Sequence, residues 1–136
     1  MRKKKSKLPI ISITDTRFRS TLISVLRRFS RFWYPSKIVL DRARIARGVY
    51  QCSSCSKVVG PKDIKIDHIN PVVPIEGFTT WDDFISRLFC DENGLQAICK
   101  DCHKIKTDKE NSSRRSCKKE KAVLKYYKNK KESDVE

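Results

Sequence analysis

Two cysteine pairs constrain this chain more than any other feature of its sequence: Cys52-x-x-Cys55 and Cys99-x-x-Cys102. Two intervening residues let one tight turn direct both sulfurs of a pair at the same metal ion, and two pairs supply the four ligands of a tetrahedral zinc site. Forty-three residues separate the pairs, too many for a simple zinc ribbon and enough for a subdomain. The pattern predicts a structural zinc; the alternative is four unrelated buried cysteines.

The sequence shows no sign of export or membrane insertion. The apolar stretch after the basic N-terminus, residues 8–13, is short and contains a proline, and nowhere do eighteen apolar residues run together. We therefore expect a cytoplasmic protein without a membrane partner. Thiols stay reduced in that compartment, so that paired cysteines are expected to bind metal and not to form disulfides.

The chain is strongly basic, with 31 Lys and Arg residues against 16 Asp and Glu residues and a net charge of +15. Residues 1–51 carry +12, residues 52–103 carry −3 and residues 104–136 carry +6. A slightly acidic centre between basic arms favours a metal-containing site that contacts DNA on both sides. The four glycines form no Gly-rich phosphate loop, which excludes a nucleotide-driven motor.

The first basic arm has helical periodicity. Apolar residues from Phe18 to Trp33 recur at helical spacing after a capping residue, Thr14 or Asp15, and a second helix is expected from about residue 36 to residue 47, ending at Gly48. We interpret the arginines of this arm as DNA contacts; the alternative is an amphipathic hairpin with solvated arginines. The predicted contacts here are Arg17, Arg19, Arg27, Arg28, Arg31, Arg42 and Arg44.

The centre of the chain alternates between strand and helix signals. Residues 49–51, 64–66 and 95–98 are strand-like, a capping box at residues 80–83 opens a helix, and another helix is expected from about Lys100. Beyond Asn111 the composition turns to Ser, Lys, Arg and Glu. That tail is expected to be disordered, or a loose helix that orders on DNA.

The histidines complete a recognisable pattern. Asp67-His68-Ile69 with Pro71, then Asn93 before Leu95-Gln96, then Cys99-x-x-Cys102-His103-x-x-Lys106-Thr107 resembles the HNH endonucleases with zinc-binding cysteine pairs. The resemblance covers about residues 49–111, and residues 16–48 resemble the basic leaders of small phage-type members. The family usually has Asn directly before Leu-Gln, where this chain has Gly94. Asn70, the other candidate for that asparagine, lies too close to His68.

The resemblance implies an α+β fold with a small, zinc-stabilised ββα-metal core, treble-clef-like, and a basic helical N-terminal extension. We expect a DNA-contacting leader over residues 1–48, the nuclease core over residues 49–111 and a basic flexible tail over residues 112–136. It also implies a bacterial or phage-infected host cell as the location.

The resemblance assigns roles to single residues. His68 is expected to be the general base, Asp67 and His103 to hold one catalytic Mg²⁺, Mn²⁺ or similar ion, Asn93 to brace the loop that presents His68, and Lys106 to reach a flanking phosphate. Asp67 and His68 would face opposite sides of a regular strand, so that both serve one site only if the strand ends there.

The identity of the fourth zinc ligand stays open at this point. His103 is the alternative to Cys102. Because successive helical residues point about 100° apart, only one of the two can bind the zinc. With four thiolate ligands the zinc is closed off from water, so that the zinc site and the catalytic ion site are separate.

The function expected is a metal-dependent endonuclease acting on duplex DNA, encoded by a phage or mobile element for homing or genome processing. A restriction role and an RNA substrate are also compatible. The alternative is a zinc-stabilised DNA-binding module without catalysis. The oligomeric state, the sequence specificity and the choice between nicking and double-strand cleavage stay open.

Overall fold

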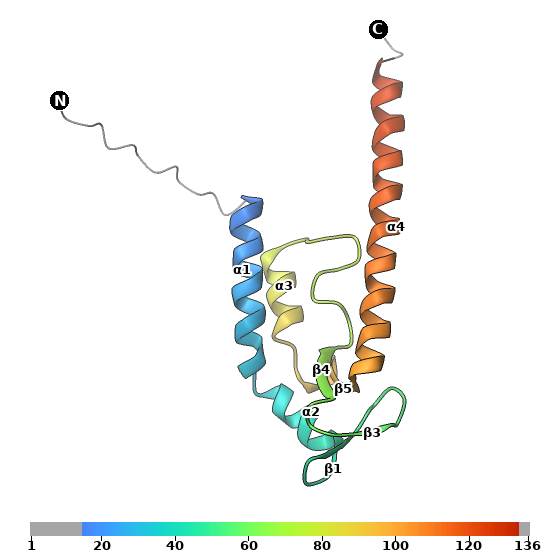
Figure 1. Cartoon of the computed structure of the whole chain (residues 1–136). Coiled ribbons are helices and arrows are strands. Elements are labelled where there is room, and N and C mark those ends of the chain that lie inside the picture. The colour runs from blue at the N-terminus through green and yellow to red at the C-terminus, as the bar shows by residue number, and fades with distance from the viewer. Residues whose placement is uncertain (1–14, 134–136) are drawn as a thin grey trace, which may run out of the picture. The chain divides into compact units, whose positions relative to one another are not determined.

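The computed structural model describes residues 15–133, with side chains up to Lys130. The chain divides into two compact units, residues 1–32 and residues 33–136 (Figure 1). The division falls before residue 48, so that the second helix of the expected leader lies in the larger unit. The described residues mix helices and strands, which confirms an α+β fold.

The described part of the smaller unit is one helix, α1 (Thr16–Phe29), followed by the short 3₁₀ helix η1 (Ser30–Phe32). The carboxylate of Asp15 accepts a hydrogen bond from the backbone N–H of Arg17 at 2.7 Å, which confirms the expected N-terminal cap. Basic residues in the last turn interact favourably with the helix dipole.

The larger unit begins with α2 (Pro35–Ala43), which is followed by β1 (Arg44–Ala46). The expectation that this helix extends to residue 47 is wrong. The backbone becomes extended at Arg44, and Gly48, with φ of +71°, turns β1 back against β2 (Val49–Gln51). Glycine adopts this left-handed conformation without strain. The third strand of this sheet, β3 (Val58–Val59), is too short to leave a sequence signal.

A second sheet consists of β4 (Ile64–His68) and β5 (Leu95–Cys99), which pair antiparallel at all five positions. Residues 69–94 connect them and contain α3 (Trp81–Leu88) and the 3₁₀ helix η2 (Glu92–Gly94). The hydroxyl of Thr80 accepts a hydrogen bond from Asp83 N at 3.2 Å, which confirms the N-terminal cap expected for α3.

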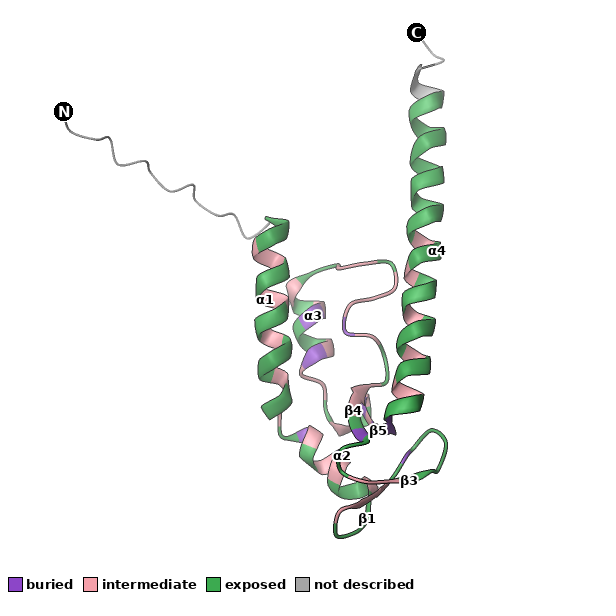
Figure 2. Cartoon of the chain, in the orientation of Figure 1, coloured by how far each residue is buried: buried purple, intermediate pink, exposed green. Residues whose placement is uncertain are grey.

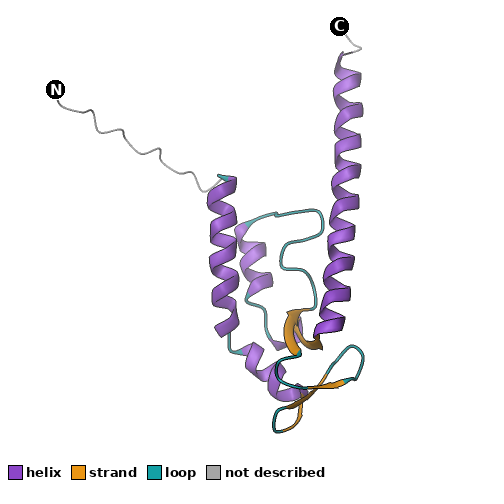
Figure 3. Ribbon diagram, in the orientation of Figure 1, coloured by secondary structure: helices purple, strands orange, loops and turns teal. Residues whose placement is uncertain are grey.

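The last element, α4 (Lys100–Ser133), begins directly after β5 and packs against β4 and β5 (Figure 3). It continues through the segment expected to form a tail, so that this segment is helical as far as Ser133. Arg114 donates a hydrogen bond to Val73 O at 2.6 Å, and Lys121 donates to Glu76 O. These contacts join α4 to the segment that follows β4.

The core of the larger unit is small and lies where α2, β4 and β5 meet (Figure 2). Val39, Ile64, Leu95 and Ala97 form one buried cluster. A second cluster contains Cys52, Ile98 and Cys99, so that the cysteines are themselves part of the hydrophobic interior. In the described part of the chain, none of the helices has the length and apolar character to cross a membrane.

Candidate functional site

The two cysteine pairs converge on one point. Cys52 and Cys55 lie in the turn after β2, Cys99 ends β5, and Cys102 lies in the first turn of α4. The four sulfurs all lie within 4.8 Å of one another, and Cys55 Sγ is 3.8 Å from Cys99 Sγ. Two zinc–sulfur bonds of about 2.3 Å at a tetrahedral angle place the sulfurs about 3.8 Å apart. These four residues can hold a metal ion.

Backbone hydrogen bonds fix the first cysteine pair in place. Ser56 N donates to Cys52 O at 2.9 Å and closes the turn, in which Ser56 has φ of +60°. The N–H and the hydroxyl of Ser53 both donate to Ala97 O of β5, at 2.9 and 3.0 Å. The turn is therefore attached to the strand that ends in the second cysteine pair.

The pKa values of Cys52 and Cys102 shift in opposite directions. Burial raises the pKa of the Cys52 thiol, but backbone N–H groups of Cys55, Cys99 and Ser54 outweigh burial and bring that pKa down to about 6. Hydrogen bonding to Cys55 and Cys99 raises the pKa of Cys102 to about 12. The cluster thus stabilises one thiolate and opposes another, a conflict that a cation among the sulfurs relieves.

The structure places Cys102, and not His103, with the other three cysteines. The side chain of His103 turns toward β4 instead, where its Nε2 lies 3.9 Å from Oδ1 of Asp67. Among the described residues, the four cysteines are the one group of three or more Cys, His, Asp or Glu side chains gathered closely enough to share an ion. Cys90 and Cys117 lie outside it.

Asp67 lies in a partly buried ionic cluster between β4 and α4. Its Oδ2 is 2.9 Å from Nζ of Lys106, which in turn lies 2.6 Å from Oε1 of Glu110. Gln96, the partner of Asp67 in the sheet, donates to the same carboxylate at 3.5 Å. The side chains of Asp67, Lys106 and Glu110 are 19%, 25% and 23% exposed, so that water screens these interactions incompletely.

Lys106 carries its full charge in this cluster. Partial burial lowers the pKa of the lysine, but hydrogen bonds to Glu110 and Asp67 outweigh burial and hold that pKa above its usual value of 10.5. Its described partners are carboxylates of the protein, whereas the sequence predicts a phosphate contact. One ammonium therefore lies between two carboxylates, with the imidazole of His103 beside them.

His68 faces a different part of the fold from Asp67. Strand pairing continues through His68, which lies opposite Leu95, and the neighbouring side chains of a strand point to opposite faces. The His68 Nε2 lies 2.9 Å from the carbonyl oxygen of Leu88, at the end of α3. Because a carbonyl only accepts, Nε2 is the donor in this contact, which makes Nδ1 the nitrogen that can act as an acceptor.

The asparagine of the predicted motif makes a local contact. Asn93 donates a side-chain hydrogen bond to Asp91 at 3.4 Å, within the turn at η2. The backbone after His68 is held instead by Gly94, whose carbonyl oxygen accepts a hydrogen bond from Ile69 N at 2.9 Å. A Cβ at residue 94 would lie 2.6 Å from Sγ of Cys90, which explains why glycine stands before Leu95.

The arginines predicted to contact DNA are divided between the two units. Arg17, Arg19, Arg27 and Arg28 lie on α1 and Arg31 on η1, whereas Arg42 lies on α2 and Arg44 on β1.

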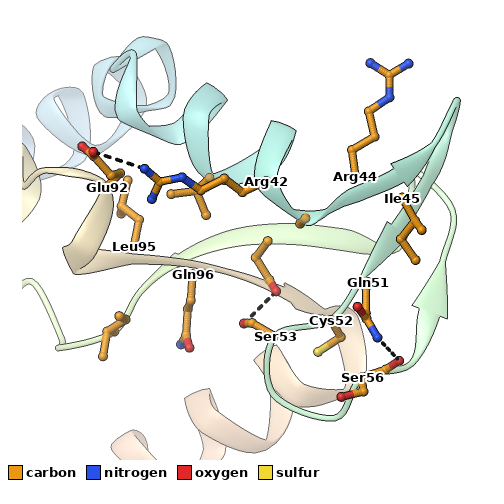
Figure 4. A pocket seen from close by; sticks show the side chains of 14 residues that line it. Arg42, Arg44, Ile45, Gln51, Cys52, Ser53, Ser56, Glu92, Leu95 and Gln96 are labelled. Carbon is orange, nitrogen blue, oxygen red and sulfur yellow. Dashed lines mark hydrogen bonds and ion pairs between the residues drawn. The ribbon is translucent and has the colours of Figure 1, made fainter.

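Arg42 and Arg44 line a pocket of about 750 Å³ in the larger unit (Figure 4). Arg42 lies 3.5 Å from Glu92 there, in an exposed ion pair. Asp67, His68 and His103 do not line this pocket.

Two groups that contact the candidate site residues were not predicted from the sequence, the carboxylate of Glu110 and the carbonyl of Leu88. The carboxylate of Glu110 could have been found, because His103, Lys106 and Glu110 follow the i, i+3, i+7 spacing of one helix face. The carbonyl of Leu88 has no side-chain signature, since any residue at the end of α3 presents one.

Comparison with protein-family models, with curated proteins and with solved structures finds no match to this chain.

Proposed function

We propose that the chain is a zinc-containing, metal-dependent DNA endonuclease of the HNH type. The observation that supports this most directly is the approach of Asp67 on β4 to His103 on α4, at 3.9 Å, within a unit in which α4 follows directly on a strand pair. A DNA-binding module without catalysis has no need of this carboxylate–imidazole pair. The pair lies on β4 and α4, and the order of β4, β5 and α4 is the strand, strand and helix order of a ββα-metal nuclease.

The pair fits a small divalent ion. Mg²⁺ binds oxygen at about 2.0–2.1 Å and related ions bind imidazole nitrogen at a similar distance, so that one ion can contact two atoms up to about 4.2 Å apart. The observed 3.9 Å between Asp67 Oδ1 and His103 Nε2 lies within that limit but exceeds the roughly 2.9 Å between adjacent ligands of an octahedral ion, so that the two side chains would move closer on binding. Carboxylate oxygen and imidazole nitrogen also suit Mn²⁺ and other transition ions. Two protein ligands leave positions open for water and phosphate.

The residues of the chain have separate tasks in phosphodiester hydrolysis. Asp67 and His103 would hold the ion, which would supply positive charge to stabilise the transition state and the leaving oxygen. His68, oriented by the carbonyl of Leu88, accepts the proton of the attacking water at Nδ1. In this proposal the phosphate lies at the end of the β4–β5 strand pair, where β4 ends at His68, and reaches the Asp67–His103 pair on one face and the ring of His68 on the other. Asn93 remains the predicted support of the backbone at that end of the strand pair.

The four cysteines hold a structural zinc in this proposal. Thiolate ligands on all four positions exclude water from the ion, so that it contributes to folding and not to catalysis. The turn after β2, with β5 and the start of α4, then makes a treble-clef-like unit around the metal. Because the apolar core is small, much of the stability of the larger unit comes from metal binding.

Duplex DNA is the proposed substrate because of the charge of the chain. Basic side chains release counterions from DNA when they contact phosphates, and the cations of the chain outnumber its anions by 15. The arginines of α1 and η1 are the proposed phosphate contacts of the smaller unit, and Arg42 and Arg44 those of the larger unit. A phage or mobile-element origin remains part of the proposal.

Cleavage of supercoiled plasmid tests this function. We expect nicked or linear DNA with Mg²⁺ or Mn²⁺ and none with EDTA, and Asp67→Asn should abolish the product. Asp63→Asn is the matched control, because Asp63 lies near the other end of β4 in an exposed pair with Lys100. DNA binding by wild type with no cleavage under any divalent ion would favour the non-catalytic module.

A further inference from the structure

The carboxylate that would hold the catalytic ion is already paired with a cation of the protein. Lys106 Nζ lies 2.9 Å from Asp67 Oδ2, and a divalent ion on Asp67 would meet that ammonium at close range. Two positive charges on one partly buried carboxylate repel each other. Ion binding and the Lys106–Asp67 pair are therefore in competition.

Glu110 offers Lys106 a second partner on the same helix. Its Oε1 lies 2.6 Å from Lys106 Nζ. Glu110 is one helical turn further along α4, so that Lys106 lies between His103 and Glu110 on one helix face. When Lys106 leaves Asp67, it can keep this contact. The energy of moving a partly buried ammonium is thereby reduced, because the charge stays paired.

We propose that Lys106 is an internal counter-ion of Asp67 which the catalytic divalent ion displaces, and that Glu110 retains the displaced ammonium. The inference rests on the proposed function, because it concerns the same ion site. It assigns Lys106 and Glu110 as positioning residues that set the affinity for the ion. The apparent affinity for the ion is then the intrinsic affinity multiplied by the fraction of molecules in which Asp67 is free.

A double-mutant cycle measured by Mn²⁺ binding tests the inference on the full-length, zinc-loaded protein. Lys106→Met should tighten Mn²⁺ binding about ten-fold, the gain expected if Lys106 occupies Asp67 in about nine molecules of ten. Glu110→Gln should weaken binding by about three-fold in the wild-type background, because Lys106 then has Asp67 as its one remaining partner. In the Lys106→Met background, Glu110→Gln should have no effect.

The cycle separates displacement from a general effect of charge. If Glu110 acts only through its negative charge, Glu110→Gln weakens Mn²⁺ binding equally in both backgrounds, and the inference is overturned. If Glu110 is a direct ligand, the substitution weakens binding most when Lys106 is absent, which also overturns it. Lys104→Met is the matched control, because it removes one exposed positive charge next to His103 and should leave affinity nearly unchanged.

Asp67→Asn distinguishes failure of this inference from failure of the proposed function. If Asp67→Asn abolishes Mn²⁺ binding while Lys106→Met binds like wild type, the ion site is correct and the displacement is wrong. If Asp67→Asn does not change Mn²⁺ binding in either the wild-type or the Lys106→Met background, both the ion site and the inference are overturned.

Discussion

In the proposed mechanism, His68 and His103 have different tasks because their surroundings differ. The ring of His68 donates to the last carbonyl of α3, which fixes its tautomer and leaves one nitrogen to accept a proton. The ring of His103, 44% exposed, stands beside a carboxylate instead. The first environment suits a general base and the second suits an ion ligand.

Substitution of each histidine should therefore have a different signature in plasmid cleavage. We expect His68→Ala to lose about a hundredfold or more of the cleavage rate, the usual effect of a lost general base, with no recovery at raised Mn²⁺. His103→Ala should also lose activity, but raised Mn²⁺ should recover part of it, because mass action fills a weakened ion site.

Both histidine variants should remain folded and keep their zinc, since the sulfur cluster contains neither residue. Zinc content by atomic absorption is the control. A His103→Ala protein without zinc would place His103 among the thiolate-site ligands. Cleavage at the wild-type rate by His68→Ala would end the mechanism proposed for this site.

Gly94 is a second residue whose surroundings decide its identity. A Cβ there would lie 2.6 Å from Sγ and 2.9 Å from Cβ of Cys90, and because Cβ cannot rotate away, Gly94→Ala forces the neighbouring turn to move. We expect a loss of about 1–3 kcal/mol in the free energy of unfolding, measured by urea denaturation. Gly60→Ala is the matched control, because no atom lies within 4 Å of its Cβ position, and equal losses in the two variants would contradict the steric argument.

At the scale of the elements, the turn after β2, the end of β5 and the start of α4 depend on one another through the cysteines. We expect Cys102→Ser to release the metal and to cost about 3 kcal/mol or more, which lowers the melting temperature by about 10 °C or more. Circular dichroism and metal analysis measure the two effects.

Cys117→Ser provides the comparison for the cysteine experiment. Cys117 lies on the same helix, α4, but outside the sulfur cluster, so that its substitution should change neither metal content nor melting temperature. A Cys102→Ser protein that melts like wild type after its metal is lost would show that the core is stable without the cluster.

The elements that the sequence predicts well are those with local signals. The caps at Asp15 and Thr80 and the strand before Cys99 are confirmed, because each depends on neighbouring residues. The end of α2 was missed, since residues 44–46 leave the helix to pair with β2, a contact that helical periodicity does not contain. Strand β3 depends on the same sheet and was missed for the same reason.

At the scale of the whole molecule, positive charge is present in both compact units. Residues 1–32 contain ten Lys and Arg residues and one acidic residue. Arg27, Arg28 and Arg31 are exposed at the end of α1 and on η1. If these arginines contact phosphates, each should contribute about 0.9 to the salt dependence of DNA binding.

Replacing Arg27, Arg28 and Arg31 together with Gln should lower the slope of log K against log salt by up to about 2.7. Fluorescence anisotropy on a short duplex at several salt concentrations measures the slope. The matched control replaces Lys118, Lys119 and Lys125 of α4, which should change the slope less. An unchanged slope in the arginine variant would mean that this part of the leader does not contact DNA.

The candidate site was predictable as a set of residues but not as a set of contacts. The cysteine spacing predicts the cluster that forms, because each pair lies in one turn. The preference for Cys102 over His103 and the pairing of Lys106 with Asp67 depend on how α4 is rotated against β4, which tertiary packing decides. The role expected for Asn93 depends on the turn that η2 adopts, where Gly94 supplies the contact.

The start of α4 limits how this chain can change in length. Cys102 and His103 are consecutive and leave the helix about 100° apart, one toward the sulfurs and the other toward Asp67. One residue inserted before Cys102 would rotate everything after it by about 100°, so that both side chains lose their partners. We therefore expect insertions and deletions between Cys99 and His103 to break these contacts, whereas the exposed far end of α4 can tolerate them.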